Sequence, residues 1–329
     1  MMELKDLAKK YVPDVNSVEF LTKCRNIIYK ANCRKYSFVL RLINSKNKDK
    51  EQIESELIFQ NYLFQNGADV VRPLPSCFGE YCICFHDEKK DLVYWVSAFE
   101  YATGKNWDER NDNDEKTFQI IGKTLGRIHR LSKEYDSKKS RRRRLWSKQH
   151  ELVNAPALFK EYNPNLYDAF FKHMEVMDRL EKSVQTFGLT HGDYLMSNYL
   201  IDGSKIKVID FDECEYSWYA MDLAICMRCY LIGSTPESVS DRTSEAEMMH
   251  YNILRGYSTE NCINEQMVYG LDAFIKVRDF IEMSRILELM LNHKTLGDME
   301  YKLFRADMDR TVNGKHFMEF KTQKVEKLL

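Results

Sequence analysis

Three side chains in the second half of the sequence, Asp193, Asn198 and Asp210, have types and spacing suited to phosphoryl transfer. Transfer from a nucleotide needs a group that positions or deprotonates the attacking hydroxyl, ligands that hold Mg²⁺ on the phosphates, and cations that stabilise phosphate charge. Mg²⁺ prefers hard oxygen ligands and keeps several waters, so one carboxylate and one amide oxygen suffice. We therefore predict that Asp193 is the base and that Asn198 and Asp210 hold the metal ion.

The segment between Asn198 and Asp210 indicates how these two residues meet. It reads as an apolar run at 198–201, an Asp-Gly turn at 202–205 and a second apolar run at 206–211. Asp-Gly between apolar runs is a strong hairpin signal. We expect a hairpin that returns Asp210 to the side of Asn198. The alternative is a polar turn in which Asp and Asn only cap the backbone.

The loop around Asp193 also carries a family motif. Protein kinases have a catalytic Asp followed, after four residues, by an Asn, and Asp193 and Asn198 reproduce this spacing. Residues 191–198 read His-Gly-Asp followed by Asn, and residues 209–211 read Ile-Asp-Phe. With these features the sequence resembles the aminoglycoside phosphotransferase and choline kinase superfamily, in which Asp-Phe or Asp-Trp replaces the Asp-Phe-Gly of protein kinases. The resemblance is nearly complete over this segment and extends more weakly over most of the chain.

Two further segments are similar to family motifs that support the catalytic loop. Residues 122–129 match a Gly-x-x-Leu-x-x-x-His helix, and residues 221–224, Met-Asp-Leu-Ala, are similar to the family's Asp-Leu-Ala helix. The resemblance implies that Asp222 braces the catalytic loop rather than taking part in chemistry. We interpret His191 as a residue that shapes the loop through backbone hydrogen bonds, and His129 as a packing residue.

The resemblance also assigns nucleotide-binding residues in the first part of the chain. Arg41 lies where the family places Lys or Arg to grip the nucleotide phosphates, and Glu56 lies where it places the partner carboxylate. An ion pair between them would hold the cation in position. Phe99, Glu100 and Tyr101 fall at the family's hinge, whose backbone would hydrogen-bond the adenine. The alternative for Arg41 is a strand residue that faces solvent.

The sequence departs from the family at the loop expected to cover the phosphates. That loop should fall near residues 22–29, which read Thr-Lys-Cys-Arg-Asn-Ile-Ile-Tyr and contain no glycine. Glycine permits close backbone approach and unusual backbone angles. Its absence weakens the expected cover over the nucleotide without excluding catalysis.

The surrounding elements change character along the chain. Residues 37–43, 81–85 and 92–101 are apolar and β-prone, which predicts strands. They surround one expected helix, in which the apolar positions between 53 and 64 have helical spacing. After residue 104 the chain reads as mainly helical.

A β-rich half joined to a helical half indicates an α+β architecture. The resemblance implies a bilobal protein-kinase-like fold, with a small β-rich N-lobe and a larger, mainly helical C-lobe. We expect a nucleotide-binding lobe over residues 1–98, a hinge over residues 99–105, and a C-terminal lobe over residues 106–329 that carries the catalytic loop and the substrate site. ATP would bind between the lobes.

An acidic and aromatic cluster follows the second predicted metal ligand. Its members are Asp212, Glu213, Glu215, Tyr216 and Trp218. Carboxylates with aromatic rings suit a cationic amine through ion pairing and cation–π contacts, so these residues are candidates for binding the phosphate acceptor. Asp212 is alternatively a second metal ligand, and the cluster is alternatively a solvated surface turn.

Composition limits the classes of partner. The chain has 329 residues and a formal net charge of −1, without the basic surplus that favours nucleic-acid binding. No stretch approaches the roughly 20 apolar residues that cross a bilayer, and the first ten residues lack the apolar core of a signal peptide. Nine scattered cysteines without metal-site spacing fit a reduced cytoplasm. We interpret the run Arg141–Arg144 as a solvated face rather than a contact for an anionic partner.

Together these features predict a phosphotransferase that uses ATP, with GTP as an alternative donor, and Mg²⁺. It would act on an alcohol hydroxyl of a small molecule, and an amine is one candidate class. We expect it in the cytoplasm as a monomer or homodimer, without a nucleic-acid or membrane partner. Two alternatives remain: a protein Ser/Thr kinase of the same superfamily, and a catalytically inactive module that binds a nucleotide or ligand. The intact Asp193, Asn198 and Asp210 argue against the inactive module, and the glycine-free segment argues for it.

Overall fold

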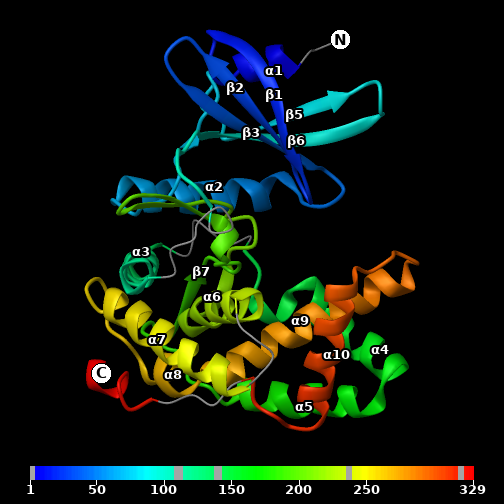
Figure 1. Cartoon of the computed structure of the whole chain (residues 1–329). Coiled ribbons are helices and arrows are strands. Elements are labelled where there is room, and N and C mark those ends of the chain that lie inside the picture. The colour runs from blue at the N-terminus through cyan, green and yellow to red at the C-terminus, as the bar shows by residue number, and fades with distance from the viewer. Residues whose placement is uncertain (1–3, 107–113, 137–142, 235–238, 318–321) are drawn as a thin grey trace. The chain divides into compact units, whose positions relative to one another are not determined.

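The computed structural model describes residues 4–106, 114–136, 143–234, 239–317 and 322–329 (Figure 1). The chain divides into two compact units. The first unit contains Met1–Arg110, Glu134–Arg143 and Ser197–Glu213, and the second contains Asn111–Lys133, Arg144–Met196 and Cys214–Leu329. The hairpin segment, which carries the predicted site residues Asn198, Asp210, Asp212 and Glu213, thus clusters with the N-terminal part of the chain.

A six-stranded antiparallel sheet forms the centre of the first unit (Figure 1). Its strands are β1 Val15–Lys23, β2 Ile27–Cys33, β3 Ser37–Asn44, β4 Pro73–Leu74, β5 Cys82–Asp87 and β6 Leu92–Glu100. They lie in the order β1-β2-β3-β6-β4, and β5 also pairs with β6. The strands expected over residues 37–43, 81–85 and 92–101 are confirmed, since β3, β5 and β6 occupy them within a few residues.

The helix α2, Lys50–Gln65, follows β3 and begins at a capping box. The Asp49 side chain accepts from the Gln52 N–H, and the Gln52 side chain accepts from the Asp49 N–H. This reciprocal pair satisfies two backbone donors at the helix start. Ile53 and Leu57 are buried as their spacing predicts, whereas Phe64 is only half-buried.

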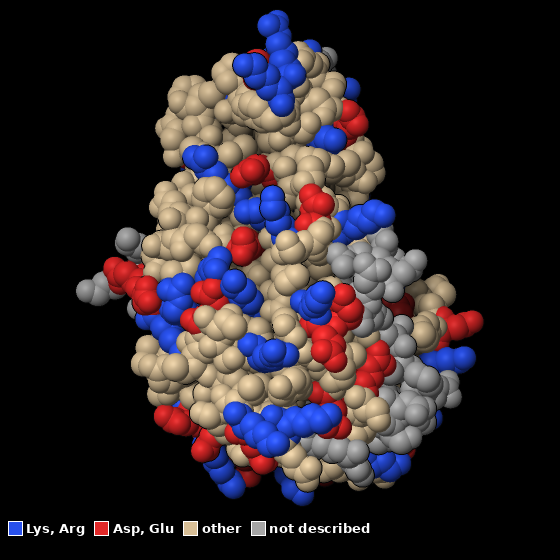
Figure 2. All heavy atoms as spheres, turned by 60° about the vertical axis from the view of Figure 1, so that its left-hand side comes forward, with Lys and Arg blue, Asp and Glu red and all other residues tan. Residues whose placement is uncertain are grey.

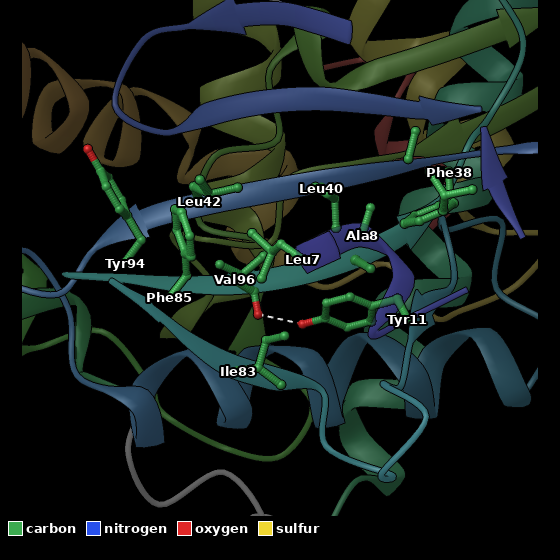
Figure 3. Close-up of a cluster of buried hydrophobic side chains, with 13 residues drawn as sticks. Leu7, Ala8, Tyr11, Phe38, Leu40, Leu42, Ile83, Phe85, Tyr94 and Val96 are labelled. Carbon is green, nitrogen blue, oxygen red and sulfur yellow. Dashed lines mark hydrogen bonds between the residues drawn. The ribbon is translucent and has the colours of Figure 1, made fainter. Parts of the chain in front are cut away.

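A second helix precedes the sheet, so the expectation of one helix among the first hundred residues was wrong. This helix, α1 Leu4–Lys9, buries Leu7 and Ala8 against the sheet (Figure 3). Just beyond it, the Tyr11 hydroxyl donates to the carbonyl oxygen of Val96 at 2.6 Å. The helix is only six residues long, so its stability depends on this packing rather than on intrinsic propensity.

The second unit is mainly helical, as predicted. Its helices are α3 Glu115–Glu134, α4 His150–Tyr162, α5 Pro164–Asp178, α6 Tyr219–Ser234, α7 Val239–Tyr257, α8 Glu265–Tyr269, α9 Leu271–Leu291 and α10 Asp298–Val312. A two-stranded sheet joins β7, Phe187–Thr190, to β10, Glu215–Trp218. Among the described residues, no helix is both long enough and apolar enough to cross a membrane.

The helices α3 and α7 approach each other backbone to backbone. A Cβ added at Gly122 of α3 would lie 1.9 Å from the carbonyl oxygen of Ile253, and one at Gly256 of α7 would lie 2.0 Å from that of Gln119. Real Cβ atoms do not come this close, so each position admits only glycine at this helix separation. The glycine of the 122–129 motif is therefore a packing requirement.

Charged side chains of both signs are interspersed over the face of the molecule in Figure 2. This pattern agrees with the near-zero formal net charge of the chain.

Candidate functional site

The predicted hairpin is confirmed in the first unit. Its strands, β8 Tyr199–Asp202 and β9 Lys205–Val208, pair antiparallel around the Asp-Gly turn. Just past β9, the N–H of Ile209 donates to the carbonyl oxygen of Asn198 at 3.0 Å. The hairpin thus returns the backbone next to Asp210 to the side of Asn198.

Asp210 has an unusual backbone conformation. Its φ angle is 63°, in the left-handed region that non-glycine residues rarely adopt. Such a conformation costs on the order of 1–3 kcal/mol, and residues held this way concentrate at functional sites. The Asp210 side chain is 49% exposed, so the hairpin presents a carboxylate to solvent in a strained geometry.

A buried ion pair lies beside this carboxylate. Arg41 of β3 makes two parallel bonds to Glu56 of α2, at 2.8 and 3.0 Å, and both side chains are buried. Arg41 Nη1 also lies 3.7 Å from Asp210 Oδ1. Burial alone would lower the pKa of Arg41, but Glu56, Asp212 and Asp210 raise it, so the guanidinium stays charged. The alternative of Arg41 as a solvent-facing strand residue is therefore wrong.

Asp212 and Glu213 are engaged by cations of the same unit. Lys48 Nζ lies 2.8 Å from Asp212 Oδ1 and 3.6 Å from Glu213 Oε1. Burial alone would raise the pKa of Asp212, but Lys48 and Arg41 hold it well below its usual range. Asp212 is 6% exposed, so the solvated-turn alternative is wrong for this residue. Sequence reasoning missed Lys48, whose only signal was its place in a polar break after a strand.

Side chains also fasten the glycine-free turn between β1 and β2. Arg25 Nη1 lies 2.9 Å from Glu213 Oε1, and Asn26 Nδ2 donates to Asp212 Oδ2 at 3.3 Å. The backbone of this turn closes with a bond from the Cys24 N–H to the Asn26 carbonyl. Side-chain bonds from Arg25 and Asn26 thus hold this turn at the position where the family would place a glycine-rich loop.

The segment predicted as the hinge begins inside β6, whose last two residues are Phe99 and Glu100. Phe99 is buried, and Arg41 stacks on its ring with the guanidinium carbon 4.9 Å from the ring centroid. The N–H of Glu100 donates to the carbonyl of Arg72 at 2.9 Å. Because the Glu100 N–H is already bonded, an adenine would have to bond other backbone groups of this segment. Tyr101 is 37% exposed.

In the second unit, Asp222 of α6 holds the loop that leads to Asp193. Its carboxylate accepts from the backbone N–H groups of His191 and Gly192 at 2.8 and 2.9 Å. Gly192 has a φ of 78°, which favours glycine. His129 Nε2 lies 3.1 Å from the same carboxylate, and burial lowers the pKa of His129 despite this neighbour.

Asp193 itself has two contacts that define its position. Its N–H donates to Nδ1 of His191 at 3.3 Å. Its Oδ1 accepts from Arg278 Nη2 of α9 at 3.1 Å. Arg278 was not singled out from the sequence, and its only signal there was a cation next to the apolar stripe of a long helix.

The aromatic part of the acceptor-binding prediction is wrong for Trp218. This side chain is fully buried, packs at an angle against Trp146 and edge-to-face against Phe187, and donates to the carbonyl of Glu181 at 2.9 Å. Glu215 is also buried, and Arg144 Nε bonds it at 2.8 Å.

The predicted solvated face of basic residues is wrong for its two described members. Arg143 donates to the backbone oxygens of Gln52 and Asp212, and Arg144 forms the pair with Glu215. Arg141 and Arg142 lie outside the described residues.

Comparisons with known proteins now bear on this geometry. Residues 28–251 match the phosphotransferase enzyme family. Amicoumacin kinase of Bacillus subtilis (strain 168) is 25% identical over 315 residues, which cover 93% of this chain and 91% of that protein. The resemblance inferred from the motifs is thereby confirmed.

Solved structures share the fold. An amicoumacin kinase in complex with AMP-PNP, Ca²⁺ and Ami has a TM-score of 0.84 at 20% identity, covering 98% of this chain and 97% of that one. A microcompartment-associated aminopropanol kinase has a TM-score of 0.64 at 19% identity, covering 94% and 97%. The expected kinase-like fold, with a β-rich first part and a helical second part, is confirmed.

Proposed function

We propose that this chain, which belongs to the phosphotransferase enzyme family, transfers the γ-phosphoryl group of a Mg²⁺-bound nucleotide to a hydroxyl of a small molecule. The chain is a phosphotransferase with an alcohol group as acceptor. The observation that carries the finer proposal is the Asp210 carboxylate, half-exposed at φ 63° beside the buried Arg41–Glu56 pair. A purely structural aspartate gains nothing from this strain.

In the first unit, Arg41 would bind the phosphates that are not transferred. Glu56 fixes the guanidinium through two bonds, so Arg41 is already oriented before a ligand arrives. Such preorganisation favours a phosphate because little side-chain entropy remains to be lost.

The donor set of the hairpin fits a magnesium–nucleotide complex. Asp210 offers a carboxylate, and Asn198, held beside the adjacent backbone, offers an amide. Within the described part of the chain, no group of three or more His, Cys, Asp and Glu residues could hold a metal ion alone. Mg²⁺ does not need one, because phosphates and waters complete its coordination. When bound, the ion would neutralise charge on the transferred phosphoryl group.

In the second unit, Asp193 would accept the proton of the acceptor hydroxyl. The bonds from Asp222 to the loop backbone hold the preceding residues, and His191 holds the Asp193 N–H. General-base catalysis of this kind contributes about 10²–10⁴-fold to a rate, so positioning of the carboxylate matters as much as its chemistry.

The acceptor class follows from the ion pairs that the acidic cluster already makes within the protein. The acidic cluster proposed to bind an amine is already paired, with Lys48 and Arg25 on Asp212 and Glu213 and with Arg144 on Glu215. We therefore infer that a hydroxyl, rather than a positive charge, is the shared feature of acceptors. Amicoumacin is the first acceptor to test, because the amicoumacin kinase structure with a TM-score of 0.84 is a complex with Ami.

The test is an ADP-release screen with Mg-ATP and with Mg-GTP. Acceptors are amicoumacin, aminopropanol, spectinomycin, choline and ethanolamine, with a generic protein substrate as a further arm. Turnover with a small molecule supports the proposal. Turnover with protein alone supports the protein-kinase alternative, and nucleotide binding by calorimetry without turnover supports the inactive module.

The matched control is Asp193→Asn. This variant should lose at least about a hundredfold in kcat while its affinity for Mg-ATP stays within about twofold. Full activity of the variant would overturn the assignment of the base.

A further inference from the structure

Arg278 of α9 makes a contact that the proposed function does not use. Its Nη2 atom lies 3.1 Å from Asp193 Oδ1 and 3.0 Å from Glu282 Oε1, one helical turn further along α9. A guanidinium Nη atom carries two hydrogens, so one nitrogen can donate to both carboxylates. Arg278 therefore links the loop aspartate to a helix.

Arg278 and Glu282 both keep their charge. Burial alone would lower the pKa of Arg278, but Glu282 and Asp193 raise it. Burial would raise the pKa of Glu282, but Arg278 and Arg285 hold it at about 2. Glu282 thus balances the guanidinium, so that Arg278 can orient the Asp193 carboxylate without fully neutralising it.

The helix that carries Arg278 is itself anchored by buried charges. Asp279, the next residue, bonds Arg228 of α6 at 2.6 Å and Arg310 of α10 at 2.7 Å. Asp307 bonds the same two arginines. We call these four residues the Arg228 ring. Because the ring ties α9 to two other helices, the base of the Arg278 side chain is fixed.

The space around the guanidinium is also restricted. A crevice lined by Gly192, Glu215 and Arg278 is too narrow to hold a water molecule. Arg278 is 13% exposed. A substrate contact by Arg278 would require this crevice to open, whereas its contact with Asp193 is already formed.

We infer that Arg278 is a positioning residue for the phosphoryl-transfer reaction, which holds one oxygen of Asp193 so that the carboxylate has a fixed orientation toward the acceptor hydroxyl. This inference rests on the proposed function. It differs from a substrate-binding role, because Arg278 acts through Asp193 and changes the rate of turnover rather than the affinity for acceptor.

The test compares Arg278→Met and Arg278→Lys with the control Arg285→Met. Arg285 bonds the same Glu282 at 2.9 Å, and the described structure shows no bond between Arg285 and Asp193. Transfer from Mg-ATP is measured to amicoumacin, and to water as slow ATP hydrolysis where amicoumacin is not consumed. Melting temperature and calorimetric binding of AMP-PNP are measured for every variant.

We expect Arg278→Met to lower kcat about 10- to 100-fold, since misplacing a catalytic group by about 1 Å has effects of this size. KM for the acceptor and affinity for AMP-PNP should stay within about twofold. Arg278→Lys should retain part of the rate, because lysine keeps the positive charge but not the planar guanidinium that bonds both Asp193 and Glu282. Arg285→Met should stay within about twofold of wild type.

Three results would overturn the inference. One is unchanged kcat in Arg278→Met; the second is a raised acceptor KM at unchanged kcat; the third is an equal loss in Arg285→Met. If Arg278→Met does not fold, Arg278→Lys decides, because a folded variant with wild-type kcat excludes the positioning role. A wild-type protein that transfers to neither amicoumacin nor water counts against the proposed function instead, so the two failures are distinguishable.

Discussion

Each unit of this protein contains a cluster in which arginines and carboxylates form buried ion pairs, and the two clusters differ in their exposure to solvent. The Arg41 cluster of the first unit contains Arg41, Glu56, Lys48, Asp210 and Asp212, and the Arg228 ring of the second contains two arginines and two aspartates. Every side chain of the ring is at most 10% exposed. The Arg41 cluster includes the half-exposed Asp210 at a strained backbone angle.

We propose that this difference separates charges that stabilise the fold from charges that bind a ligand. In the ring, two arginines face two aspartates and each aspartate bonds both arginines, which offsets much of the desolvation cost inside the protein. Burial and the neighbouring Asp279 still raise the pKa of Asp307 to about 6. In the Arg41 cluster, part of the stabilisation is missing: the Arg41 Nε is buried without a hydrogen-bond partner among the described residues. A buried unsatisfied donor costs about 1–3 kcal/mol, and a bound phosphate oxygen would remove that cost.

The largest effect should come from Asp210→Asn. Asn tolerates the left-handed backbone but removes the negative charge that holds a divalent cation. We expect kcat/KM for Mg-ATP to fall at least about a thousandfold, roughly 4 kcal/mol. The free energy of unfolding should change by less than about 0.5 kcal/mol. A steady-state assay measures kcat/KM, and urea denaturation measures the free energy of unfolding. A variant that loses stability but keeps its activity would show that Asp210 has a structural role like that of the ring aspartates.

Asp279→Asn in the Arg228 ring should show the opposite profile. Removing one charge leaves two buried arginines with a single carboxylate, which destabilises by about 3 kcal/mol. Urea denaturation measures this change, and affinity for AMP-PNP in the folded fraction should stay within about twofold. Asp309→Asn is the control, because Asp309 lies on α10, next to the ring residue Arg310, with its carboxylate 62% exposed. Equal stability of the two variants would contradict a structural role for the ring.

The next effect tests the burial of a single histidine. Burial lowers the pKa of His250 to about 4, and its Nε2 lies 2.8 Å from the Met267 carbonyl oxygen. Since the folded pKa lies below the unfolded value of about 6.5, the unfolded state binds more protons between these values. Stability should therefore fall by about 2 kcal/mol between pH 7 and pH 5 on account of this residue. In His250→Gln the fall should be smaller by about that amount, as urea denaturation at both pH values would show; an unchanged slope contradicts it.

The smallest effect should come from Arg25→Gln in the glycine-free turn. Its pair with Glu213 is a surface ion pair, because the Arg25 side chain is 63% exposed, and such pairs contribute about 0–1 kcal/mol. We expect KM for Mg-ATP to rise no more than about threefold, with the melting temperature unchanged. Arg34→Gln, on an exposed turn elsewhere in the first unit, is the control. A hundredfold effect would mean that the turn is part of the nucleotide site in its own right.

The sequence predicted those features that depend on local spacing. The Asp-Gly turn predicted the hairpin, and the Gly-x-x-Leu-x-x-x-His spacing predicted a helix over residues 122–129, which lie within α3. The pairing of Arg41 with Glu56 came from a family resemblance, since no local rule joins a strand to a helix fifteen residues away. The roles assigned to these residues remain predictions.

What the sequence did not predict depends on tertiary contacts. Arg278 reaches Asp193 across 85 positions, and Lys48 reaches Asp212 across 164. Trp218 is of a residue type that often binds ligands, yet its position on β10 directs its side chain into the core.

The glycine contact between α3 and α7 limits how this enzyme can evolve. The same helix that carries Gly122 carries His129, whose ring touches the Asp222 carboxylate. A side chain at residue 122 or 256 would separate the helices and shift His129 with them, away from the brace of the catalytic loop. Laboratory libraries that broaden acceptor range should therefore keep both glycines constant, even though neither residue lies near a substrate-binding candidate in the sequence.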